Sequence, residues 1–80
     1  MKDDPIPVTH AVGKLIRLTA YSSEVDGREQ VVLDAQEVEK VVPSAISKTG
    51  ELDYNAITAV LVNAVKELST EIAILKRRVL

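Results

Sequence analysis

Hydrophobic residues recur with heptad spacing along the last third of the chain, residues 54–80. Successive members are separated alternately by four and three residues, and we call them the seam: Leu61, Val65, Leu68, Ile72, Leu75 and Val79. Every d position of this heptad is Leu and every a position is β-branched, the combination preferred in parallel coiled coils. The pattern therefore predicts one long helix whose seam faces another helix.

The length of this helix indicates that its partner is another chain. A helix over residues 54–80 would be about 40 Å long, and residues 1–53 form too small a body to cover it. Glu71 falls at a g position and Lys76 at the next e position, the spacing of an interchain ion pair between parallel helices. We therefore expect an oligomer in which these two residues set the orientation of the helices.

The hydrophobic pattern changes repeatedly within residues 1–53, which predicts several short elements. Thr9 is a candidate N-cap for a helix over about residues 10–18. Two strands are expected at about 19–24 and 29–33, because Asp26-Gly27 between them is a strong hairpin signal.

Turn and capping signals divide the rest of this region. Asp34 and Glu37 form a capping-box pattern for a helix over residues 35–42, which must stop before Pro43. A second small hairpin is expected around Gly50, and Asp53 is a candidate N-cap for the long helix. The predicted fold class is α+β: a small body (1–53) of short helices and hairpins and a long oligomerisation helix (54–80), one domain overall.

Composition limits the chemistry available to this chain. It has 80 residues, a net charge of −2, two Tyr, no Phe or Trp, and no Cys. The charge argues against nucleic acid as a main partner, and no apolar run is long enough to span a membrane. With one His and no Cys we expect no metal site and no cofactor. Oligomerisation is then the remaining way to stabilise so small a core.

Two segments occur in a fixed order, DAQEVEKVVPSAI at residues 34–46 and LDYNAITAVLVNAVKEL at residues 52–68. Together they resemble the C-terminal intramolecular chaperone autoprocessing domain of phage tail fibres, tailspikes and endosialidases. Looser similarity upstream extends the resemblance over nearly the whole chain. It implies a homotrimer that helps the preceding β-rich fibre or spike segment to assemble in the host cytoplasm, and that stays in the virion tail fibre if it is not released.

In that family the domain releases itself with a Ser–Lys pair, and the cut is made just before the Ser. Lys2 is placed where the family has its Lys, but Met1 precedes it directly and no Ser stands at the nucleophile position. A Lys without a hydroxyl to activate cannot cleave by this route. Two explanations remain open: Met1 begins a shortened form of a longer fibre protein, or the chain is a freestanding relative that does not cleave itself.

Three function classes follow, and the number of chains helps to separate them. They are a trimerisation and folding module, a self-cleaving serine peptidase truncated just after its nucleophile, and a coiled-coil adaptor for an unrelated partner.

The residues at a and d favour a coiled coil of two helices, whereas the resemblance implies three. Val62 at e and Ala64 at g widen the apolar stripe, so we expect a parallel trimeric coiled coil.

Overall fold

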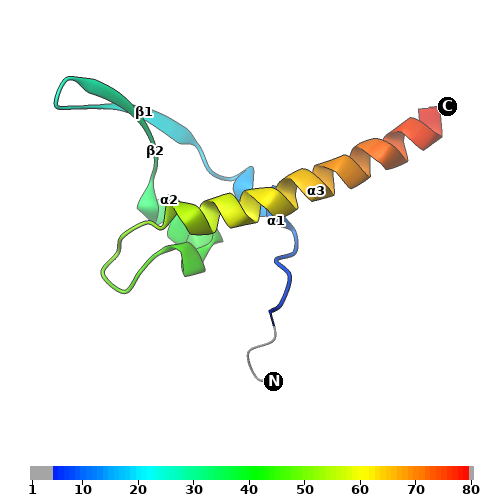
Figure 1. Ribbon diagram of the computed structural model, residues 1–80, viewed down its shortest axis with the longest axis horizontal. Coiled ribbons are helices and arrows are strands. Elements are labelled where there is room, and N and C mark those ends of the chain that lie inside the picture. Colours follow the sequence, from blue (N-terminus) through cyan, green and yellow to red (C-terminus); the bar gives the residue numbers. More distant parts are fainter. Residues whose placement is uncertain (1–4, 80) are drawn as a thin grey trace.

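The computed structural model describes residues 5–79, and of Val79 only the backbone. The short helices lie beside the first half of the long helix α3 (Tyr54–Val79), whose second half extends away from them (Figure 1). The elements before α3 are, in order, α1 (Ala11–Leu15), β1 (Ala20–Val25), β2 (Arg28–Leu33), α2 (Ala35–Val41) and the 3-10 helix η1 (Pro43–Ala45). The predicted α+β class with a long C-terminal helix is confirmed.

The first helix, α1, is shorter than predicted and begins differently. It ends at Leu15 rather than near Leu18, and its N-cap is His10, not Thr9. His10 has a left-handed backbone (φ 56°) and makes no side-chain capping bond. The prediction was wrong because a residue far along the chain, Glu67, binds the free N–H groups of this helix.

The hairpin of β1 and β2 matches the sequence prediction. Ala20 pairs with Leu33 at one end and Val25 with Arg28 at the other, in antiparallel register. Asp26 and Gly27 form the two-residue turn with φ of 52° and 75°. Positive φ at both central residues defines a type I′ turn, whose twist matches that of the strands. All of β1 is exposed, and the hairpin projects away from the other elements (Figure 1).

Side-chain caps begin both α2 and α3. Asp34 accepts a hydrogen bond from the backbone N–H of Gln36 at 2.8 Å, and Asp53 accepts one from that of Asn55 at 2.9 Å. Glu37 does not complete a capping box, which corrects the prediction; its carboxylate accepts the Tyr21 hydroxyl at 2.8 Å instead.

The turn between α2 and α3 is only partly a hairpin. Within the described residues, the predicted second hairpin amounts to one isolated bridge between Ile46 and Leu52. Gly50 has a left-handed backbone there (φ 87°), and its N–H donates to the carbonyl of Ser47 at 2.9 Å. This short link returns the chain directly into α3.

One aliphatic core joins the small elements to α3. Its buried members are Ala11, Val38, Val42, Ala45, Ile57, Val60 and Ala64. Val38 is the largest side chain that is fully enclosed. The α3 members lie in the first half of the helix, on one face, so the core fixes the small body against that face and leaves the others open.

Candidate oligomerisation face on the long helix

The seam is exposed along its described length. Leu61, Val65, Leu68, Ile72 and Leu75 keep between 43% and 62% of their surface accessible. These side chains lie on neighbouring turns of one helix, so they form a continuous apolar stripe. Such a stripe on a small protein is typical of an interaction surface. Val79, the last predicted member, has its side chain outside the described residues.

The small body packs beside the seam and not on it. The α3 side chains packed in the core with the body, or capping α1, include Ile57, Val60, Ala64 and Glu67. At about 100° per residue, this stripe and the seam are centred roughly 80° apart around the helix. The packing of the long helix on its own body therefore uses another face and leaves the seam uncovered.

The residues predicted to flank the seam have different environments. Ala64, at g, is 5% exposed because the body covers it. Val62, at e, is 56% exposed. Val62 lines a shallow apolar hollow together with Thr58, Leu61, Val65 and Lys66. Ala64 thus serves to seat the body, and only Val62 is left to widen the open stripe.

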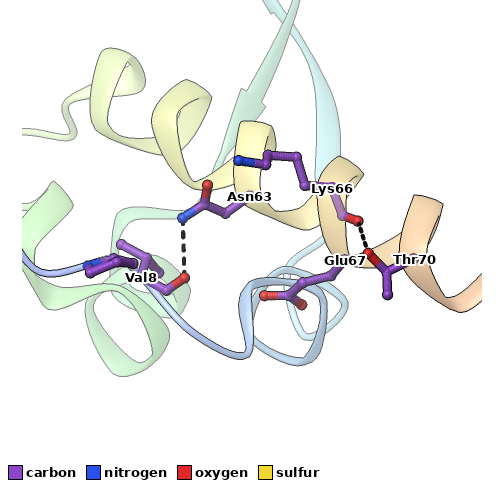
Figure 2. Close-up of a pocket in the computed structure, with 6 residues that line it drawn as sticks. Val8, Asn63, Lys66, Glu67 and Thr70 are labelled. Carbon is purple, nitrogen blue, oxygen red and sulfur yellow. Dashed lines mark hydrogen bonds between the residues drawn. The ribbon is translucent and has the colours of Figure 1, made fainter.

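Two polar side chains of α3, one helical turn apart, hold the N-terminal segment on this helix. Glu67 accepts hydrogen bonds from the backbone N–H groups of Ala11 at 2.8 Å and Val12 at 3.0 Å. The Asn63 amide donates to the carbonyl of Val8 at 3.1 Å (Figure 2). We call these contacts the clamp, and they fix residues 8–12 at the height where the seam begins to extend beyond the body.

The clamp was missed in the sequence because its partners are more than 50 residues apart. Glu67 is at a c position and Asn63 at an f position of the heptad. Both positions face away from the seam, so the sequence predicts only solvent-exposed side chains there. The two backbone hydrogen bonds from Val12 and Ala11 lower the pKa of Glu67, since they favour the charged carboxylate. Because Thr9 offered a local N-cap for this helix, no feature of the sequence pointed to a cap supplied from α3.

A second polar contact ties the hairpin to α2. The Tyr21 hydroxyl donates to Oε2 of Glu37, and this bond to a carboxylate raises the pKa of Tyr21. Oε1 of Glu37 is buried and has no hydrogen-bond partner in the described part of the chain. This contact steadies the base of the hairpin while its tip stays free.

The remaining predicted site residues are not brought together in a single chain. Glu71 and Lys76 are both exposed on the second half of α3. Lys2, the candidate Lys of the self-cleaving pair, lies outside the described residues.

Residues 5–79 hold neither a metal-site cluster nor a helix that could span a membrane. No group of three or more His, Asp or Glu side chains there is arranged to hold a metal ion. None of the helices in that range is long and apolar enough to cross a membrane. Comparison of the chain with protein families, with curated proteins and with solved structures gives no match.

Proposed function

We propose that this chain is a homotrimerisation module that promotes folding of a β-rich fibre or spike segment joined to its N-terminus. The observation that carries the proposal is the exposed seam, which lies free of the body on a helix with regular a and d positions. The similarity of residues 34–46 and 52–68 to phage chaperone domains supplies the number of chains and the kind of cargo.

The seam supplies the driving force for association. Burying the remaining exposed part of each described seam residue is worth about 1 kcal/mol per side chain. This burial free energy is gained in each of the three chains, and its sum must exceed the free-energy cost of the translational and rotational freedom lost on association. Glu71 of one helix and Lys76 of the next would then select the parallel arrangement.

The folding function follows from linking the chains. Strand pairing between three separate chains is slow because its contacts are non-local. A helical bundle forms from local structure and raises the effective concentration of the attached segments. The clamp supports this role, since it sets residues 8–12 at one height on α3 and would bring three upstream segments into the same register.

The proposal is tested by fusing the chain to a trimeric β-stalk that does not assemble alone. Ile72→Asp places a charge in the seam, and we expect it to abolish the yield of detergent-resistant stalk trimer. Ala73→Asp is the matched control, because Ala73 lies on the next position of the same turn, at b, facing away from the seam. Equal trimer yields from the two variants would contradict the proposal.

A further inference from the structure

The two flanks of the seam differ in a way that concerns the neighbouring chain. On the g side, the helix is covered by its own body, which buries Ile57 and Ala64. The apolar hollow shares Leu61 and Val65 with the seam and extends onto the e side through Val62. Each chain therefore carries a body on one flank and an empty apolar surface on the other.

Parallel packing brings these unlike flanks together. In parallel coiled coils the g position of one helix lies beside the e position five residues further along the next helix. Ile57 and Val62 have this spacing, as do Glu71 and Lys76. The part of the body that covers Ile57 thus reaches the hollow of the adjacent copy.

We propose that, in the trimer, the small body of one protomer occupies the Val62 hollow of the next. This inference rests on the proposed homotrimer. The occupying segment is residues 41–48, which contain η1 and its flanks, because η1 contacts α3 and the Ala45 carbonyl accepts the N–H of Asp53, just before α3 begins, at 2.7 Å. Val41 and Ile46 in this segment are only half-buried in the single chain.

The chemistry of the hollow suits this apolar occupant. Its one hydroxyl, that of Thr58, already donates to the carbonyl of Tyr54 at 3.0 Å. Its charged member, Lys66, lies at b, on the outer side of the hollow. An aliphatic segment can therefore enter without leaving a buried polar group unpaired.

The contact between body and hollow also accounts for a closed ring of three chains. Body and hollow are different surfaces, so each chain uses its body on one neighbour and its hollow on the other. Contacts of this heterologous kind form a closed ring when the rotation between copies allows it. Three copies around a parallel helical bundle meet that condition, and every hollow is then filled.

Photo-crosslinking from position 62 tests the inference. A benzophenone amino acid replaces Val62 in the full chain, and isotope-labelled and unlabelled copies are mixed before irradiation. Trypsin releases residues 41–48 as a separate peptide, because Lys40 and Lys48 bound it. We expect crosslinks from one copy to the 41–48 peptide of another. The same probe in place of Ala59, at a b position on the outer side of α3, should give none.

The outcomes separate this inference from the proposed function. Crosslinks confined to the 49–66 peptide of another copy, or none between copies of a trimer, would overturn the inference and leave the trimer standing. A monomer mass with no crosslinks between copies would overturn both. If the bulky residue prevents assembly, Val62→Cys labelled with a benzophenone maleimide carries the same probe, since the chain has no other Cys.

Discussion

At the scale of single residues, Glu67 joins two helices that are far apart in the sequence. Its carboxylate caps α1 from another helix and so closes the body around α3. Sequence reasoning identified the local caps Asp34 and Asp53, because a cap and its target lie within three residues. A cap that depends on tertiary packing leaves no comparable pattern, and for that reason Glu67 could be found only in the structure.

The lowered pKa of Glu67 predicts how stability depends on pH. A group whose pKa is lower in the folded state stabilises the protein above its unfolded pKa, about 4.3 for Glu, and this contribution is lost as pH falls through the folded pKa. We expect Glu67→Gln to lower stability near neutral pH and to reduce the loss between about pH 5 and pH 3. Urea denaturation across this range measures both effects.

Glu39→Gln is the matched control, because Glu39 is exposed on α2. The control should keep the stability of the original chain near neutral pH. If Glu67→Gln and Glu39→Gln gave the same pH profile, the clamp would have no energetic role.

At the scale of elements, the sequence predicted each α-helix and the first hairpin, but it missed η1 and misjudged some boundaries. The Asp26-Gly27 turn and the stop before Pro43 are set by local backbone geometry, so they were read correctly. The length of α1 and the extent of the second hairpin depend on contacts with α3. The seam could be predicted because heptad spacing is a local pattern. The face of α3 that the body covers could not be predicted, because it depends on contacts with residues distant in the sequence.

Substituting two glycines with alanine should change the stability of the protein in opposite directions. Gly27 has φ of 75° in the hairpin turn, whereas Gly13 lies inside α1, and an added Cβ would meet no atom within 4 Å at either position. Gly27→Ala should therefore cost about 1 kcal/mol through left-handed strain. Gly13→Ala should stabilise by about 0.5–1 kcal/mol by lowering the entropy of the unfolded chain.

Denaturation midpoints of these two variants and the original chain measure the difference. Hydrogen exchange of the β1 and β2 amides shows whether the cost at Gly27 falls on the hairpin. Shifts of both midpoints in the same direction would show that backbone conformation at these positions does not set the balance.

At the scale of the whole molecule, the chain divides its surfaces between internal and external contacts. One stripe of α3 builds the core with the small body, and a second stripe, the seam, remains open. Sequence reasoning found the open stripe from its spacing and expected another chain to cover it. It could not separate the roles of Val62 and Ala64, since both are small aliphatic residues beside the seam.

The mass of the full chain in solution tests the central claim most directly. Light scattering coupled to size-exclusion chromatography, at micromolar concentration, should give three times the mass of one chain. Leu68→Asp should reduce this to a single chain with the body still folded, because Leu68 lies on the seam and outside the core. A folded monomer of the unaltered chain would contradict the account and favour an adaptor that awaits a different partner, and a clean dimer would remove the fibre-chaperone proposal.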